Sequence, residues 1–337
     1  MFCFFVLFIH AASEIVSAGT EGSAIYAPVA ALWRMCGCAT QGFVFLAGLR
    51  FAVSQKRSDK EFKPLKYVFS RFLRILPLYL AWCAIYYAYN ILISGEGFYI
   101  SDFFGGVLLG DIAPHLYFIP IILQFAVIAP FSLLLRKKLP AAFILPAAVL
   151  ITSVMGDCLP DLIGVVFPQA PYFEYSDRIF TSFLIFWSAG CCAGEEYDSF
   201  VKTLDNAKGV ITAGFLLAAA LDLGAVYYSF VLNRFVWCIK QIQTLYVLTA
   251  IIFVMMISRA ATRRTSAPLF LQKADLASYS IYLSHILPLW LVQLGIDKLG
   301  LGLTCGFFIR LAVLLVWALI LAAIYGQRLY RIHASSK

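Results

Sequence analysis

Long apolar runs separated by short polar loops occupy the chain from its first residues to residue 325. About 20 residues cross a bilayer core, and shorter runs cross where the bilayer thins or the segment is half-buried. The pattern predicts an all-α, polytopic membrane protein of about ten transmembrane helices, with residues 1–337 as a single domain. We place the spans at 1–13, 28–50, 75–94, 115–135, 141–156, 179–194, 208–231, 242–258, 277–296 and 302–325.

The composition agrees with a protein that uses lipid as its solvent. Hydrophobic residues make up 62% of the 337 residues and charged residues 13%, whereas soluble domains average about 45–50% and about 25%. The nine cysteines are scattered and show no Cys-x-x-Cys spacing. We therefore interpret them as small buried hydrophobes and expect no metal site.

The net charge of +8 is explained by where the basic residues lie in the loops. Most of the 26 basic residues lie in alternate loops, which is typical of cytoplasmic loops. This places both termini in the cytoplasm. Because membrane topology explains the positive charge, we expect no nucleic-acid partner. The opposite loops Ser13–Ala27 and Ser94–Pro114 carry no Lys or Arg, and segment 155–178 mixes carboxylates with aromatic rings. Such a mixture suits a carbohydrate, although an ordinary interfacial aromatic belt would look the same.

The N-terminal run is short. Thirteen helical residues extend about 20 Å, less than the roughly 30 Å of a bilayer core. A signal peptide is an alternative, but no basic region precedes the run and His10 interrupts it. We expect the true start to lie upstream and to complete a first span.

His10 is the most informative residue, because an ionisable side chain within hydrocarbon costs a few kcal/mol and usually serves ion, proton or substrate handling. Glu14 lies four residues later, on the same helix face. A carboxylate bound to one imidazole nitrogen leaves the other nitrogen to act as a base. The pair is thus a candidate for catalysis, and simple helix packing is the alternative.

Arg71 and Arg74 lie three residues apart at the predicted cytoplasmic surface. Guanidinium groups bind phosphates in bidentate fashion, so this pair could hold a phosphate-rich donor such as coenzyme A. The alternative is a membrane anchor on the cytoplasmic side.

Several further polar residues lie in or beside predicted spans and are candidates for a cavity or for the site of the receiving substrate: Arg34, His115, Gln124, Tyr282 and His285. For His115 the alternative is an interfacial histidine. For His285 it is a polar contact between helices.

Five stretches in order resemble acyltransferase family 3, the bacterial membrane acyltransferases that modify surface carbohydrates. They are Phe8–His10, Gln41–Gly48, Arg71–Tyr79, His115–Pro120 and Ser278–His285. The resemblance implies ten transmembrane helices in the bacterial inner membrane and an acyl-CoA, with acetyl-CoA expected, as donor substrate rather than bound cofactor. It also implies O-acylation of a cell-surface or lipid-linked saccharide, with His10 as the essential histidine and Arg71 and Arg74 near the donor.

The chain departs from the family at two points. Many members carry an arginine eleven residues before the histidine, a position that this sequence does not contain, and the family's Ser-Gly is here Ala47-Gly48. The main alternative function is a saccharide exporter or flippase without acyl-transfer chemistry. A scaffold subunit of a polysaccharide-synthesis complex is a further alternative.

Overall fold

The computed structural model describes residues 1–19, 25–58, 61–95, 97–168, 175–264 and 268–335, which form helices and no strand. They group into two compact units. The first contains 1–40, 207–237 and 249–337, and the second contains 41–206 and 238–248. The expectation of one domain over 1–337 stays a prediction.

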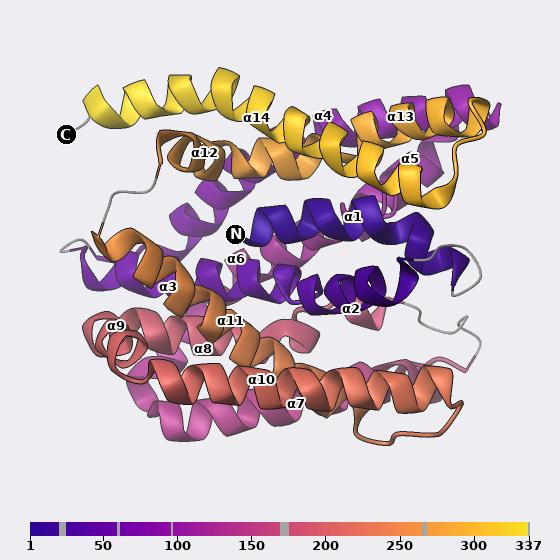
Figure 1. The fold of residues 1–337 in the computed structure, drawn as a ribbon. Coiled ribbons are helices and arrows are strands. Elements are labelled where there is room, and N and C mark those ends of the chain that lie inside the picture. The colour runs from indigo at the N-terminus through magenta and orange to yellow at the C-terminus, as the bar shows by residue number, and fades with distance from the viewer. Residues whose placement is uncertain (20–24, 59–60, 96, 169–174, 265–267, 336–337) are drawn as a thin grey trace. The chain divides into compact units, whose positions relative to one another are not determined.

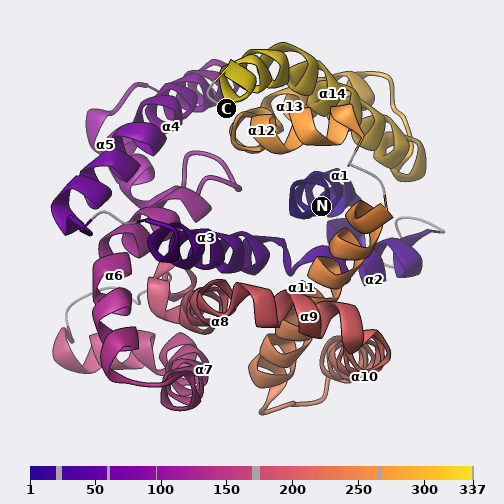
Figure 2. The ribbon, with the colours of Figure 1, turned by 90° about the vertical axis from the view of Figure 1, so that its left-hand side faces the viewer.

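Unit 1 is built from two N-terminal helices and five later ones. These are α1 (Phe2–Ala18), α2 (Tyr26–Cys36), α10 (Lys208–Val226), the larger part of α11 (Ile239–Arg264), α12 (Leu269–Ser284), α13 (Ile286–Lys298) and α14 (Leu303–Ser335), with the π-helical turn η3 (Tyr227–Val231) after α10. Helix α14 packs along α12 and α13, and α1 packs against α14 (Figure 1). Viewed along the helices, α1 lies between α2 on one side and α12 and α14 on the other (Figure 2).

Unit 2 contains the central part of the chain. Its helices are α3 (Ala39–Lys56), α4 (Pro64–Ser94), α5 (Ile100–Leu109), α6 (Phe118–Lys138), α7 (Ala141–Val166), α8 (Leu184–Glu195) and α9 (Tyr197–Asn206), with the 3-10 turns η1 (Ser176–Arg178) and η2 (Phe180–Phe183). Helix α4 packs on α5 and α6, and α7 packs on α8.

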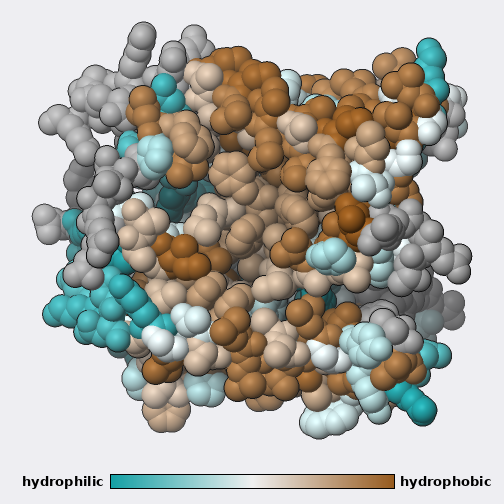
Figure 3. Space-filling view, viewed as in Figure 1, coloured by the Kyte–Doolittle hydropathy of each residue, from teal (hydrophilic) through white to brown (hydrophobic). Residues whose placement is uncertain are grey.

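The helices carry apolar side chains outward as well as inward, as expected in a bilayer. Large exposed hydrophobic residues occur on nearly every long helix, including Phe131, Leu216 and Leu319. Figure 3 shows apolar residues over much of the visible face and a hydrophilic patch over α9. Helix α9 is strongly amphipathic in sequence, with Asp198, Lys202 and Asp205.

Among the described residues, six segments are long and apolar enough to cross a membrane: Tyr26–Lys56, Pro64–Ile93, Phe118–Lys138, Lys208–Ser229, Ile239–Thr262 and Leu303–Ile324. A seventh consists of α12 and α13, which are bent by 56° at their junction. The structure thus confirms an all-α protein with six or seven such segments, whereas about ten spans and two cytoplasmic termini stay predictions. Helix α1 continues to Ala18, five residues beyond the predicted 1–13, and reaches about 26 Å.

The bend between α12 and α13 differs from the straight span predicted at 277–296. Pro288 lies just inside α13 and has no N–H to donate to the carbonyl of Ser284, with which its ring also clashes in a straight helix. The helix therefore breaks at His285. A broken helix at membrane depth is tolerated where it is buried in protein or lines a cavity.

Candidate active site

His10 lies in unit 1 and faces another histidine. Its half-buried ring lies 4.9 Å, centroid to centroid, from the ring of His285, which is completely buried at the α12–α13 break. This side of α1 therefore faces protein rather than lipid. Two stretches that carry the family resemblance, Phe8–His10 and Ser278–His285, meet at this contact.

The tautomer of His285 follows from its hydrogen bond. Its Nδ1 lies 2.7 Å from the carbonyl oxygen of Tyr282. A carbonyl oxygen only accepts, so Nδ1 carries the proton of this hydrogen bond. The Tyr282 side chain is also buried, with its ring 6.0 Å from that of His285. The indole of Trp317 on α14 donates to the hydroxyl of Ser284, 2.8 Å away, and fixes the end of α12.

Arg310 on α14 is a functional candidate that the sequence reasoning missed. Its side chain is 1% exposed, its Nε–H donates to the carbonyl of Ala11 at 3.1 Å, and its Nη1 donates to Oε1 of Gln293 at 2.7 Å. The guanidinium therefore reaches α1 at the residue after His10. A lone arginine within the apolar stretch Leu303–Ile324 was the signal available in the sequence.

Glu14, the predicted partner of His10, lies on the same helix but is exposed. Its charge acts on Arg310, together with that of Asp297. The orientation of His10 by Glu14 stays a prediction.

Arg34, a candidate cavity residue, forms an ion pair with Asp222 in unit 1. Its Nε and Nη2 donate to the two carboxylate oxygens at 2.8 and 2.7 Å, and this pair ties α2 to α10. Asp222 is 1% exposed, so the pair is largely withdrawn from solvent.

Arg71 and Arg74 lie on α4 in unit 2, with Arg71 half-buried and Arg74 exposed. The guanidinium of Arg71 lies 5.2 Å from the ring centroid of Tyr67, which in turn lies 5.2 Å from that of Phe51. A cation–π contact of this kind helps to hold a guanidinium in place.

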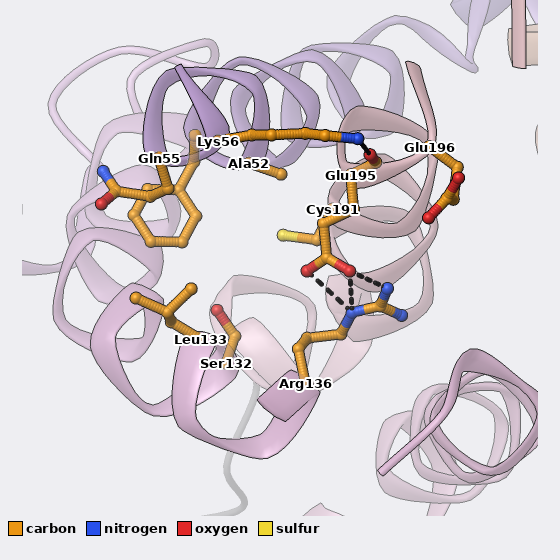
Figure 4. Close-up of a pocket in the computed structure, with 10 residues that line it drawn as sticks. Ala52, Gln55, Lys56, Ser132, Leu133, Arg136, Cys191, Glu195 and Glu196 are labelled. Carbon is orange, nitrogen blue, oxygen red and sulfur yellow. Dashed lines mark hydrogen bonds and ion pairs between the residues drawn. The ribbon is translucent and has the colours of Figure 1, made fainter. Parts of the chain in front are cut away.

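Phe51 also lines a cavity of about 350 Å³ between α3, α6 and α8. Figure 4 shows Lys56 reaching across its rim to the backbone carbonyl of Glu195, and Arg136 bound to the carboxylate of Glu195. The polar lining comes from chain segments predicted to be cytoplasmic. Ring contacts through Phe51 and Tyr67 therefore link the wall of this cavity to Arg71.

His115 and Gln124, the other candidates, make contacts within unit 2. His115 is 2% exposed in the turn before α6 and contacts the ring of Tyr86 edge to face, at 5.3 Å, so it is more buried than an interfacial histidine. The amide of Gln124 donates to the carbonyl of Arg178 and accepts from the N–H of Phe180, both at 2.9 Å. It therefore secures the turns before α8.

A second cavity of unit 2, of about 220 Å³, is rich in polar groups. Its lining includes Gln41, Thr152, Asp177, Lys240 and Gln243. Asp177 and Ser176 belong to the segment 155–178 that suggested a carbohydrate. Its residues Tyr172, Phe173 and Glu174 lie outside the described residues.

Within the described part of the chain, no group of three or more His, Cys, Asp or Glu side chains could hold a metal ion.

Residues 1–326 match the sequence model of a protein family described as the acyltransferase domain. No curated protein and no solved structure matches the chain.

Proposed function

The chain belongs to acyltransferase family 3, and from this membership we propose that it moves an acyl group, expected to be acetyl, from cytoplasmic acyl-CoA to a hydroxyl of a cell-surface or lipid-linked saccharide. Membership makes the protein an acyltransferase, and its apolar helices make it a multi-pass membrane protein. We further propose that it acts in the bacterial inner membrane.

The observation that carries the proposal is the contact of His10 with the fully buried His285. A base that removes a proton from a hydroxyl must lie within protein, where water is excluded and its orientation is fixed. In support, the half-buried His10 packs against the buried ring of His285. We propose that His10 takes the proton of the attacking hydroxyl, with Glu14 as an auxiliary charge.

Arg71 and Arg74 are proposed to bind the donor phosphates. The support is their common position on α4 and the contact of Arg71 with Tyr67, beside the cavity that contains Lys56. The saccharide is proposed to use the polar cavity around Gln41 and Gln243, because its amide and hydroxyl groups suit sugar hydroxyls. A partner protein could present that saccharide.

The test is a deletion strain complemented with native protein or with variants, followed by mass spectrometry of its surface glycans. Native protein should restore acylation, whereas His10→Ala should abolish it at equal protein level in the membrane. A purified Arg71→Gln/Arg74→Gln protein should show a higher KM for acetyl-CoA. Unchanged glycan acylation with His10→Ala would remove the catalytic assignment.

Family membership favours acyl transfer over the alternative of saccharide export. A thermal-shift measurement in detergent separates the two, because a ligand at 100 times its Kd stabilises a protein by about 2.7 kcal/mol. Acetyl-CoA should raise the melting temperature of native protein and should act more weakly on Arg71→Gln/Arg74→Gln. An exporter that uses no acyl donor would show no shift with any acyl-CoA.

A further inference from the structure

Arg310 is a buried cation whose hydrogen bonds, within the described part of the chain, run to neutral groups. Its acceptors are the carbonyl of Ala11 and the amide oxygen of Gln293. Both acceptors orient the guanidinium but bring no negative charge into contact with it. Since burying an unpaired charge is costly, a chain that keeps one in its interior usually uses it.

The third nitrogen of Arg310, Nη2, indicates where the guanidinium could bind a further group. Nη2 is buried and has no hydrogen-bond partner among the described residues. In a planar guanidinium, one N–H of Nη2 points in the same direction as the N–H of Nε. Because Nε donates to Ala11, this unused donor is directed toward the same stretch of α1, where Ala11 follows His10 in the chain.

A relay from the protein surface fixes this orientation. The amide nitrogen of Gln293 donates to the carboxylate of Asp297 at 2.7 Å, while its amide oxygen accepts from Arg310. The amide is thus bound at both ends and cannot turn without losing both bonds. Asp297 on α13 and Glu14 on α1 are both exposed, and their charges act on Arg310 from a distance rather than through a hydrogen bond to it.

We propose that Arg310 stabilises the oxyanion that forms during acyl transfer, an inference that rests on the proposed function. The hydroxyl oxygen of the saccharide attacks the thioester carbonyl carbon, a C–O bond forms, and the carbonyl π pair moves to its oxygen. His10 takes the hydroxyl proton, and Nη2–H of Arg310 donates to the oxyanion. The C–S bond then breaks, the carbonyl re-forms, and the thiolate leaves with the proton from His10.

His285 has a positioning role in this arrangement. Its ring contacts that of His10, and its own orientation is set by the Tyr282 carbonyl and by the break at Pro288. The base, its neighbouring ring and the cation thus come from α1, from the α12–α13 break and from α14. A cation fixed before the reaction starts avoids reorganisation cost when the negative charge develops.

The experiment uses purified full-length protein in nanodiscs of bacterial phospholipid, supplied with acetyl-CoA and with the acceptor glycan as a membrane extract of the deletion strain. Release of free CoA is followed. For Arg310→Gln we expect kcat to fall about 100-fold or more, with the KM for acetyl-CoA within about threefold, as for loss of an oxyanion donor.

A second variant keeps Arg310 and the total charge. Gln293→Glu/Asp297→Asn moves one carboxylate from the surface into contact with the guanidinium, which strengthens its attachment but cancels its charge. We expect an equal or higher melting temperature and a kcat at least about tenfold below native. Asp297→Asn alone is the matched control, which loses the same surface carboxylate and should stay closer to the native rate than the double variant.

The outcomes separate the two proposals. Lack of CoA release by native protein overturns the proposed function and this inference together. Native turnover that survives in the folded Arg310→Gln protein, or in the double variant, overturns the inference alone. A purely structural arginine would make the double variant at least as active as native protein, which is the opposite of the expected result.

Discussion

The ion pair between Arg34 and Asp222 allows a sharp test of how unit 1 is held together. Two hydrogen bonds of 2.8 and 2.7 Å join the guanidinium to a carboxylate that is 1% exposed. The arginine side chain is 22% exposed. The pair is a polar connection between α2 and α10, two mostly apolar helices.

The two partners should differ in the cost of their removal. Arg34→Met leaves a carboxylate buried without its cation, and breaking a buried pair in this way costs about 3–5 kcal/mol. We expect about 3 kcal/mol, because the partly exposed arginine implies some access of water. Asp222→Leu should cost less, about 1–2 kcal/mol, since the long arginine side chain can turn its charge toward water or headgroups. The double variant should return to within about 1 kcal/mol of native stability, as buried pairs replaced by apolar residues often do.

The assay is equilibrium unfolding in mixed micelles with increasing SDS, followed by tryptophan fluorescence, on native protein, both single variants and the double variant. The double-mutant cycle should give a coupling free energy of about 3–5 kcal/mol in magnitude. Single-variant effects that add within about 0.5 kcal/mol in the double variant would refute the reasoning. A pair that is broken in lipid would produce that additivity.

Three further changes test other parts of the structure. Gly48→Val should destabilise the protein by about 2 kcal/mol in the same SDS titration, because even a Cβ at this position would lie 2.5 Å from the carbonyl oxygen of Trp187. Gly214→Val is the control, because a Cβ there meets no atom within 4 Å. Gln124→Leu should cost about 2 kcal/mol through loss of two backbone hydrogen bonds, and a cost below about 0.5 kcal/mol would contradict that role. Pro288→Ala should restore the backbone hydrogen bond to Ser284 and reduce the 56° bend, which should lower kcat by displacing His285. A native kcat in the folded variant would count against the importance of the bend.

The helices were predictable because apolar runs of about 20 residues have few alternatives in a membrane protein. The run at 208–231, for example, became α10 and η3, ending at Val231. The sequence also contains the cause of the bend in 277–296, since Pro288 removes a backbone hydrogen-bond donor. Hydropathy averages over the whole window and therefore cannot show where an apolar helix breaks.

The candidate site was predictable in part. His10 and His285 stood out because each interrupts an apolar run, but their contact joins residues 275 positions apart in the sequence, which no local pattern encodes. Arg310 was missed because a single arginine near one end of a span resembles an interfacial anchor. Its burial depends on α1 and α13, which cover it in the folded unit.

Arg34 and Arg310, both in unit 1, show why residue type alone does not assign a role. Arg34 meets a carboxylate with two hydrogen bonds, so its charge is matched and its donors on that side are used. Arg310 meets a carbonyl and an amide, so it is oriented without a carboxylate in contact, and one buried nitrogen has no hydrogen-bond partner among the described residues. Matched charges stabilise the fold and respond little to a new anion, whereas a fixed and unmatched cation lowers the energy of any negative charge that forms beside it. The first arrangement suits a structural link between helices, and the second suits catalysis beside His10.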